Sequence, residues 1–332
     1  MTPLESRRAF LASLAAVGVA RRARADASSR LPLAFSTLGC PGWSLAKIVE
    51  EADHLGYAAV ELRGIEGEMD LTQRPELKGM AIAETKRRFS DQGLVISDLG
   101  ASARMHEAET TARAAQLEEG RRFIDLAHEL GVPYVRVFGD KLVMGEAKEK
   151  TIERIVLGLR TLGEHAKGSG VSVLLESHGD FTGSADLKAI LTGVNLPTVA
   201  LLWDAHHTVV FGKEAPAETW RALGPFVRHT HLKDSRPHGD GVRYVLTGEG
   251  NVPVRETVRV LVEGGYKGYY CYEWEKKWHP ELEEPEVAFP HYVRMMAGYL
   301  NARSAEGDGQ GRGGPHWSSP GMASIDKVLP RP

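Results

Sequence analysis

The chain has 332 residues, of which 42% are hydrophobic and 26% are charged. This composition excludes a collagen-like, coiled-coil or wholly disordered protein, and the length allows one large domain or two ordinary ones. The two cysteines, Cys40 and Cys271, are too few for a disulfide scaffold or a cysteine-rich zinc cluster. The formal net charge is −3 at pH 7, although residues 1–25 are rich in arginine. The rest of the chain is therefore more acidic, which argues against binding to the phosphate backbone of nucleic acids.

Residues 1–25 have the features of an export signal. Arg7 and Arg8 precede Phe10-Leu11 and an apolar stretch of about eleven residues, which is too short to span a membrane. Ala23-Arg24-Ala25 has the small residues of a signal peptidase site. The segment resembles the twin-arginine export signal of bacteria, and an amphipathic surface helix is the alternative interpretation. The resemblance implies a periplasmic or secreted protein that is not inserted in the membrane once the signal is removed.

Short strand-like runs alternate with amphipathic helical segments through the middle of the chain. Several helices are expected to end at a glycine, as in Leu130-Gly131-Val132, because glycine adopts the left-handed conformation that closes a helix. The predicted strands are, in chain order, 32–36, 59–63, 95–99, 134–138, 172–177, 199–204, 227–233 and 268–274. The predicted helices are 45–55, 81–90, 110–130, 150–167, 185–192, 218–223, 254–263 and 287–300.

Eight strand–helix units over about 270 residues match the size of a closed parallel (β/α)8 barrel. The alternative, an open doubly wound sheet, would place a glycine-rich phosphate loop after the first strand, and residues 36–42 have no G-x-G-x-x-G order. We therefore predict an α/β protein with a single TIM barrel domain at residues 26–302. From Ser304 onward the sequence is rich in glycine and poor in apolar residues, so residues 303–332 are predicted to be a flexible tail.

Ionisable side chains occur where four consecutive predicted strands end. These ends read Glu176-Ser177-His178, Asp204-Ala205-His206-His207, His231-Leu232-Lys233 and Cys271-Tyr272-Glu273-Trp274-Glu275. In (β/α)8 barrels the active site lies at the carboxyl ends of the strands, and residues two apart share one face of a strand. Three carboxylates and one histidine would form an oxygen-rich site for Mn²⁺, Mg²⁺, Co²⁺ or Zn²⁺. The alternative is that each acidic side chain is a solvated residue at the rim of the barrel.

The segments L-L-E-S-H-G-D-F, L-L-W-D-A-H-H, H-T-H-L-K-D and Y-C-Y-E-W-E resemble the sugar phosphate isomerase/epimerase superfamily, which has xylose isomerase-like barrels. The resemblance implies four metal ligands, Glu176, Asp204, His231 and Glu273. It also implies that His207, in the motif D-x-x-H, contacts the substrate. Other pocket residues that it implies, with substrate-binding roles, are Glu61, Arg63, Arg136, His178 and Lys233. For the two arginines a buried ion pair is the alternative.

Trp274 is a further substrate-binding candidate, because it lies near the end of the last predicted strand and its indole could stack on a sugar ring. Ordinary packing is the alternative for this side chain. Cys40 and Cys271 belong to neighbouring strand–helix units, and we expect two free thiols rather than a disulfide.

Two glutamates beside a divalent ion suit proton transfer next to a carbonyl group. While the ion stabilises the enediolate, Glu176 or Glu273 removes a proton and the other returns one, so both are predicted catalytic residues together with His207. We therefore expect a divalent-metal-dependent isomerase or epimerase of an unphosphorylated ketose or keto-sugar. The alternative is a metal-dependent lyase or dehydratase that eliminates from a 3-keto sugar or 3-keto glycoside. A non-catalytic sugar-binding protein and an endonuclease IV-like nuclease are further alternatives, which the paired glutamates and the acidic chain disfavour.

Export bears on the metal and on the partners. Copper and zinc outcompete manganese for such ligands in an unprotected compartment, and folding before twin-arginine export would fix the metal in the cytoplasm. We therefore predict Mn²⁺ as the cofactor. The expected partner is a small carbohydrate and not a nucleic acid. A homo-oligomer, or a redox enzyme that supplies the keto-sugar, is compatible with the sequence.

Overall fold

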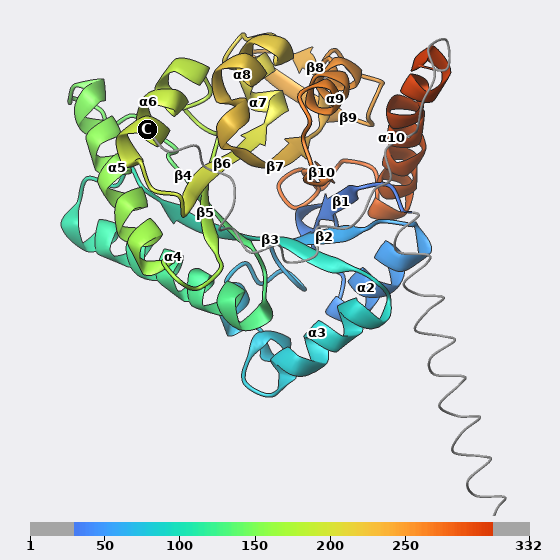
Figure 1. Cartoon of the computed structure of the whole chain (residues 1–332), viewed down its shortest axis with the longest axis horizontal. Helices are drawn as coiled ribbons and strands as arrows, with labels where there is room; N and C mark the ends of the chain where they lie inside the picture. The colour runs from blue at the N-terminus through green and yellow to red at the C-terminus, as the bar shows by residue number, and fades with distance from the viewer. Residues whose placement is uncertain (1–29, 308–332) are drawn as a thin grey trace, which may run out of the picture.

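The computed structural model describes residues 30–307, which form a closed barrel of parallel strands surrounded by helices (Figure 1). Neighbouring strands follow the order β1-β10-β7-β6-β5-β4-β3-β2, and β1 pairs with both β2 and β10 to close the barrel. The barrel strands are β1 Leu33–Ser36, β2 Ala59–Leu62, β3 Val95–Arg104, β4 Tyr134–Phe138, β5 Ser172–Glu176, β6 Val199–Asp204, β7 Val227–Leu232 and β10 Tyr270–Tyr272. The prediction of an α/β protein with one (β/α)8 barrel is confirmed.

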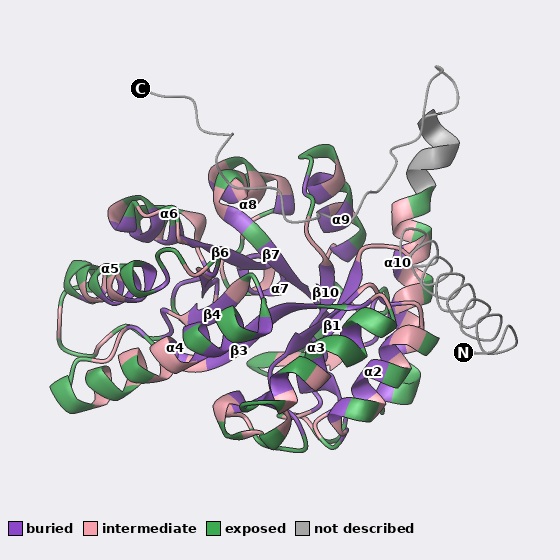
Figure 2. Cartoon of the chain, turned by 60° about the horizontal axis from the view of Figure 1, so that its bottom comes forward, coloured by how far each residue is buried: buried purple, intermediate pink, exposed green. Residues whose placement is uncertain are grey.

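The helices lie outside the barrel and turn their buried faces toward it (Figure 2). They are α2 Leu45–His54, α3 Ala81–Asp91, α4 Thr110–Leu130, α5 Lys148–His165, α6 Ser184–Val194, α7 Ala205–Val210, α8 Pro216–Leu223, α9 Val254–Glu263 and α10 Pro285–Gly307. Short 3₁₀ helices cover Thr37–Gly39, Leu71–Gln73, Pro75–Leu77 and Gly224–Phe226. The predicted glycine stop after Leu130 is present, since Gly131 caps α4 with a φ of 75°.

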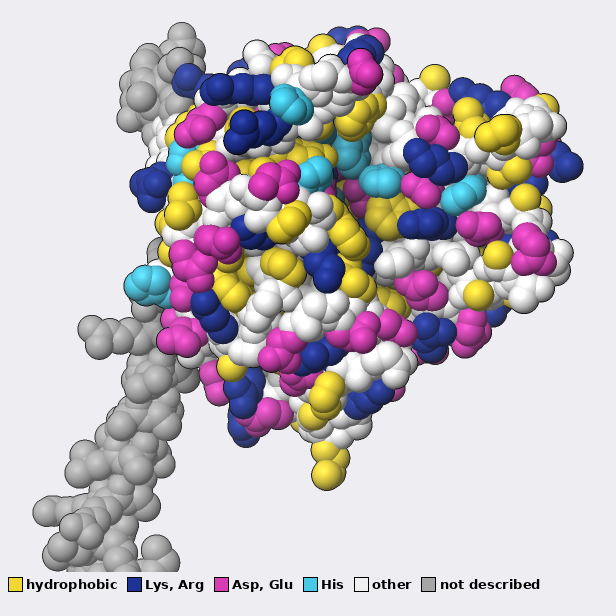
Figure 3. Space-filling model, turned by 180° about the vertical axis from the view of Figure 1, so that it is seen from behind, with side chains coloured by type: hydrophobic (Ala, Val, Ile, Leu, Met, Phe, Trp, Pro, Cys, Tyr) yellow, Lys and Arg dark blue, Asp and Glu magenta, His cyan; other side chains and the backbone are white. Residues whose placement is uncertain are grey.

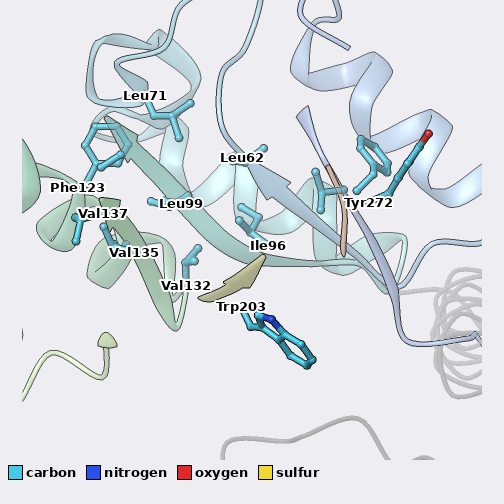
Figure 4. Close-up of a cluster of buried hydrophobic side chains, with 14 of the residues drawn as sticks. Leu62, Leu71, Ile96, Leu99, Phe123, Val132, Val135, Val137, Trp203 and Tyr272 are labelled. Carbon is cyan, nitrogen blue, oxygen red and sulfur yellow. The ribbon is translucent and has the colours of Figure 1, made fainter. Parts of the chain in front are cut away.

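Hydrophobic side chains fill the layer between the strands and the helices (Figure 4). Leu62 on β2 and Leu99 on β3 are fully buried there, together with Phe123 from α4. Because side chains alternate along a strand, the residues before them, Glu61 and Asp98, face the inside of the barrel, and these two residues are paired in the β2–β3 register. The outer layer therefore supplies the apolar core, and the inner layer carries charged groups.

Strand β3 extends five residues beyond its predicted end, to Arg104. The extension is held by side chains of α4, because the Ser102 amide donates to Glu119 Oε1 at 2.6 Å and the Arg104 amide donates to Gln116 Oε1 at 2.8 Å. Helix α10 likewise continues to Gly307, which places residues 303–307 in a helix and not in the predicted tail. The predicted export signal at 1–25 and the remainder of that tail lie outside the described residues.

A two-stranded antiparallel hairpin, β8 Asp234–His238 and β9 Gly241–Val245, follows β7 and was not predicted. Its base is fixed by the Asp234 carboxylate, which accepts hydrogen bonds from the backbone amides of Ser235, Gly248, Gly250 and Val252 at 2.8–3.1 Å. At Gly250 an added Cβ would lie 2.0 Å from Asp234 Oδ1, so a larger residue does not fit there.

Within residues 30–307, no helix is both long and apolar enough to cross a membrane. Both cysteines are free and buried, as the sequence analysis expected. Cys271 faces the barrel interior, where its Sγ lies 3.9 Å from Glu61 Oε2.

Burial raises the pKa of both thiols, and each is shielded from solvent. We therefore expect Cys40 and Cys271 to remain unreactive toward Ellman's reagent in the native protein and to yield two thiols per chain in denaturant without reductant. A fast-reacting thiol in the native protein would contradict the burial, and the absence of thiols after denaturation would reveal a disulfide.

Candidate metal centre and active site

The four side chains predicted as metal ligands meet at the carboxyl ends of four neighbouring strands. Glu176 ends β5, Asp204 ends β6, His231 lies on β7, and Glu273 directly follows β10. Asp204 pairs with His231 in the β6–β7 register, and one potential ligand atom from each of the four residues lies within 4.8 Å of the others. The four residues are buried. On the molecular surface, histidine side chains gather around a hollow (Figure 3).

The carboxylates around His231 favour a positive charge on or beside its ring. Its Nδ1 lies 3.2 Å from Glu273 Oε1 and 3.7 Å from Glu176 Oε1, whereas its Nε2 lies 2.7 Å from Glu61 Oε2. Burial opposes a charged ring, but the carboxylates of Glu273 and Glu61 raise the pKa of His231. Two carboxylates close to one imidazole nitrogen are stabilised when a proton or a metal cation lies between the nitrogen and the carboxylate oxygens.

Glu61 lies behind His231 and does not contact the other predicted ligands. Its Oε2 accepts hydrogen bonds from His231 Nε2 and, at 3.1 Å, from His229 Nε2. Burial disfavours the charge, but the two histidines outweigh it and lower the pKa of Glu61. A carboxylate on the far nitrogen fixes the orientation of a ligating histidine. The resemblance implied a substrate contact for Glu61, and the structure places this side chain one layer deeper.

Lys233 is fully buried between three carboxylates. Its Nζ forms ion pairs with Asp204 Oδ2 and Glu275 Oε1, each at 2.7 Å, and also with Glu273. Burial would lower the pKa of this ammonium, but Asp204, Glu273 and Glu275 raise it. Lys233 therefore provides a fixed positive charge at the edge of the ligand cluster.

The two arginines lie on the opposite side of the cluster. Arg136 is buried, and its Nε lies 3.1 Å from Glu176 Oε2. Arg63 donates to the Gly100 carbonyl at 3.3 Å and to Ser102 Oγ at 2.9 Å. The structure therefore gives Arg136 the buried ion pair that was considered as the alternative to a substrate contact.

The donor set fits a divalent cation. Among the described residues, Glu176, Asp204, Glu273 and Glu275 form a group of carboxyls whose basic partners include Arg136, Lys233 and the imidazole of His231. Carboxylate oxygens with one imidazole are ligands that Mg²⁺, Mn²⁺, Co²⁺ and Zn²⁺ accept. The roles of Glu176, Asp204, His231 and Glu273 as ligands remain predictions that this geometry supports.

The two predicted bases differ from the neighbouring Glu275 in their ionisation. Burial opposes the charge of Glu176, but Arg136 and His231 outweigh it and lower its pKa to about 2. Burial is likewise outweighed at Glu273, where His231 and Lys233 lower the pKa. By contrast, burial raises the pKa of Glu275. Glu176 and Glu273 are therefore the ionised groups that could accept a proton.

His207 lies beside the cluster in a defined tautomer. Its Nδ1 lies 2.9 Å from the Ser177 carbonyl oxygen and donates a hydrogen bond to it, because a carbonyl oxygen can only accept. In the neutral ring, Nε2 is then the acceptor. Burial and the Lys233 ammonium lower the pKa of His207 to about 3, so the ring is neutral at neutral pH. Its backbone amide donates to Asp204 Oδ1 at 3.0 Å, which links the two residues of the D-x-x-H motif.

His178 lies against His207, with ring centroids 5.1 Å apart. Its Nδ1 lies 3.1 Å from Asp140 Oδ1. Burial would lower the pKa of His178, but the hydrogen bond to Asp140 and the charge of Glu176 raise it. The sequence analysis did not identify Asp140, which follows β4 and has no motif of its own.

The structure corrects the interpretation of Trp274. This indole is fully buried, stacks on Tyr272 with ring centroids 5.6 Å apart, and donates from Nε1 to the Glu283 carbonyl at 2.8 Å. Because Glu273 faces the ligand cluster, the next residue along the chain faces away from it. Trp274 is therefore a packing residue on the outside of the barrel, not a stacking surface for a sugar.

Tyr244 was missed, because its hairpin was not predicted. The tyrosine lies on β9 with its ring 5.9 Å from Lys233 Nζ and 5.4 Å from the ring of His206. A signal was present in the sequence, since the turn residues Gly239-Asp240-Gly241 are followed by Val242-Arg243-Tyr244, which alternate in polarity.

Comparison with known proteins places this geometry in a family. The model of the xylose isomerase-like TIM barrel family matches residues 49–296. Inosose dehydratase from Klebsiella pneumoniae, strain 342, is 31% identical over 186 residues, which cover 48% of this chain and 61% of that protein. The match thus spans about three fifths of the length of that relative.

Two solved structures share the fold. A 3-keto-D-glucoside 4-epimerase from E. coli has a TM-score of 0.65 and 16% identity, covering 82% of this chain and 100% of that one. A xylose isomerase-like TIM barrel protein from Mycobacterium smegmatis in complex with magnesium has a TM-score of 0.58 and 21% identity, covering 74% and 90%. Because the family model covers more than half of the chain, and the strands close in the expected order, the protein belongs to the xylose isomerase-like TIM barrel family.

Proposed function

We propose that the protein is a divalent-metal-dependent sugar isomerase or epimerase that acts on an unphosphorylated ketose or keto-sugar. The observation that carries this proposal is the pair of ionised glutamates, Glu176 and Glu273, at the two ends of the four-strand arc β5-β6-β7-β10. Both approach His231 Nδ1, so a small substrate bound beside an ion at this point would have a base on each side. A binding protein without turnover has no need for a base on each side of its ligand.

A divalent ion held by Glu176, Asp204, His231 and Glu273 would supply electrostatic stabilisation of the negative charge that develops on the substrate oxygens. One glutamate accepts the proton from the carbon next to the carbonyl, and the electron pair of the broken C–H bond moves toward the carbonyl oxygen. The other glutamate takes up a proton from solvent water and returns it to the opposite face of the same carbon, and the first glutamate releases its proton to solvent. Lys233 holds the carboxylates of Asp204, Glu273 and Glu275 in place, and His207 Nε2 accepts a hydrogen bond from a substrate hydroxyl.

Elimination is the second candidate, and the similarity to inosose dehydratase favours it. The same base would remove the α-proton, and the electron pair would then expel a substituent from the next carbon, which leaves as water or as an alcohol. The glutamate that has accepted the α-proton would then donate this proton to the leaving group. A lyase or dehydratase acting on a 3-keto sugar or 3-keto glycoside therefore uses the same residues.

We further propose Mn²⁺ as the ion and the periplasm, or secretion, as the location of the mature protein. The support is the twin-arginine pattern in residues 1–25, together with the relative metal affinities discussed above. An enzyme that oxidises a sugar to a keto-sugar would supply the substrate. The proposed function is also compatible with a homo-oligomer of the barrel. Elemental analysis of protein purified from the periplasm tests the metal: stoichiometric zinc with full activity would overturn the assignment.

Glu273→Gln should abolish net conversion, with a loss of about 10²–10⁴-fold in kcat, because the amide cannot accept a proton. Sugar binding should be largely retained. Conversion, sugar affinity and metal content are measured together, and Glu153→Gln, on the exposed face of α5, is the control. Unchanged turnover in Glu273→Gln would contradict the mechanism.

Incubation with ketoses and 3-keto-glucosides in D₂O distinguishes the two reactions. An isomerase or epimerase incorporates deuterium at the carbon next to the carbonyl without loss of water or aglycone. A lyase releases water or the aglycone instead. If neither deuterium uptake nor release is detected for any of these sugars, the proposed function is wrong.

Chelation of the metal should abolish activity and lower Tm, and Mn²⁺ should restore both. Without the metal, the carboxylate ligands repel one another and lack the positive charge that they share. A metal ion at 100 times its Kd contributes about 2.7 kcal/mol to the free energy of unfolding. Differential scanning calorimetry with and without EDTA measures the shift. A Tm and an activity that are both insensitive to EDTA would contradict a resident metal.

Glu61→Gln should weaken metal binding by about 10–100-fold, because it removes the charge that orients and polarises His231. Calorimetric titration of the apo-protein with Mn²⁺ measures the affinity without relying on activity. Glu153→Gln should bind Mn²⁺ like the parent protein. Equal affinities for Glu61→Gln and the parent would show that Glu61 has no effect on the centre.

A further inference from the structure

We propose that the hairpin β8–β9 and the adjoining loops form a second binding subsite, which holds a ring attached to the sugar. The substrate class would then be a glycoside with a flat or ring-shaped aglycone, not a free monosaccharide. This inference rests on the proposed function, because it assigns a position next to the same reacting sugar.

Aromatic side chains form a continuous chain of contacts across the mouth of the barrel. Phe211, after α7, lies 5.8 Å from the ring of His207 and 5.9 Å from that of His206. His206 lies 5.4 Å from Tyr244 on the hairpin, and Tyr244 lies 5.2 Å from His279, after β10. These rings come from three separate segments, so the arrangement is a product of the fold and not of one local motif.

The chain of rings begins at the catalytic cluster and runs outward. Tyr244 lies 5.9 Å from Lys233 Nζ, and His207 Nδ1 lies 3.3 Å from Asp204 Oδ2. Glu273 is only 4% exposed, whereas Phe211 is 50% exposed. Because His206 is fully buried, a substituent on the solvent side of a sugar bound at the glutamates would contact the partly exposed rings of Phe211, Tyr244 and His279 before reaching solvent.

The outer aromatic rings expose apolar surface to water, and no neighbouring side chain among the described residues covers it. Phe211 is half exposed, and Trp278, next to His279 in the chain, is 54% exposed. Aromatic faces are favourable surfaces for the C–H groups of a sugar and for the face of another ring. Exposed aromatic side chains gathered beside a polar catalytic cluster are the pattern of a binding site with one apolar end and one polar end.

The hairpin is fixed in place before any ligand binds. The Asp234 carboxylate holds four backbone amides at its base, and His206 Nε2 lies 2.8 Å from Ser235 Oγ. The bond to Ser235 joins the hairpin to the segment that carries His207. A platform that is already ordered loses little conformational entropy on binding, so its contacts contribute more fully to affinity.

The test compares two probes, 3-keto-glucose and its phenyl β-glycoside, by calorimetric titration of the Mn²⁺-loaded protein. The parent protein should bind the phenyl glycoside more tightly than 3-keto-glucose. In Phe211→Ala and in Tyr244→Ala, the affinity for the glycoside relative to that for 3-keto-glucose should fall about tenfold, which is the effect of one lost ring–ring contact.

Leu157→Ala is the matched control, because Leu157 is an exposed apolar residue on α5 (61% exposed) and lies outside the chain of rings. This variant should keep the affinity ratio of the parent. Binding of both probes with equal affinity, or ratios unaffected by Phe211→Ala and Tyr244→Ala, would overturn the subsite alone. Failure of the parent protein to bind either probe, with no deuterium exchange into any keto-sugar, would overturn the proposed function and the subsite with it. A change confined to the oligomeric state of the two variants would identify the rings as a subunit interface, which also overturns the subsite.

Discussion

Repulsion between buried carboxylates is the constraint on which the candidate site depends. Glu176, Asp204, Glu273 and Glu275 lie at the ends of parallel strands, and hydrogen bonding around a closed barrel prevents these strands from moving apart. Like charges in a poorly hydrated interior are costly unless opposite charge is supplied. Lys233 supplies part of it. The same repulsion that would destabilise the fold would give the proposed site its affinity for a divalent ion.

The residues below the cluster explain why His231 presents Nδ1, and not Nε2, to the other predicted ligands. Glu61 comes from β2, which lies on the other side of the barrel from β7, and it holds His231 Nε2 at 2.7 Å. The two residues are 170 positions apart in the sequence, so only the closed barrel brings them together. Asp98, beside Glu61 in the register, is fully buried and its carboxyl oxygens make no hydrogen bond. Burial raises the pKa of Asp98, so a neutral acid there adds no further repulsion to the cluster.

Local patterns were sufficient to predict the strands and the four residues of the cluster, because strand ends and residue alternation are properties of short segments. Asp204, for example, was found from the end of β6, whereas the role of His207 was implied by the family resemblance of its D-x-x-H motif. The errors concern relations between distant segments. The extension of β3 depends on α4 side chains, and the burial of Trp274 depends on which face of β10 meets α10. The depth of Glu61 follows from its contact with β7. The hairpin is the exception, because it had a local signal in Gly239-Asp240-Gly241 that the prediction did not use.

The proposed catalytic residues alone would not select between epimerisation, isomerisation and elimination, because all three reactions begin with removal of the same proton. They diverge in the fate of the electron pair. Return of a proton requires only the second glutamate, whereas elimination also requires the bond to the leaving group to lie parallel to the developing electron pair. A rigid surface that holds the attached ring fixes the orientation of that bond. The rings from Phe211 to His279 are tied to the cluster through His207 and to the hairpin through Tyr244. The outcome of the reaction would therefore depend on side chains that never contact the proton being transferred.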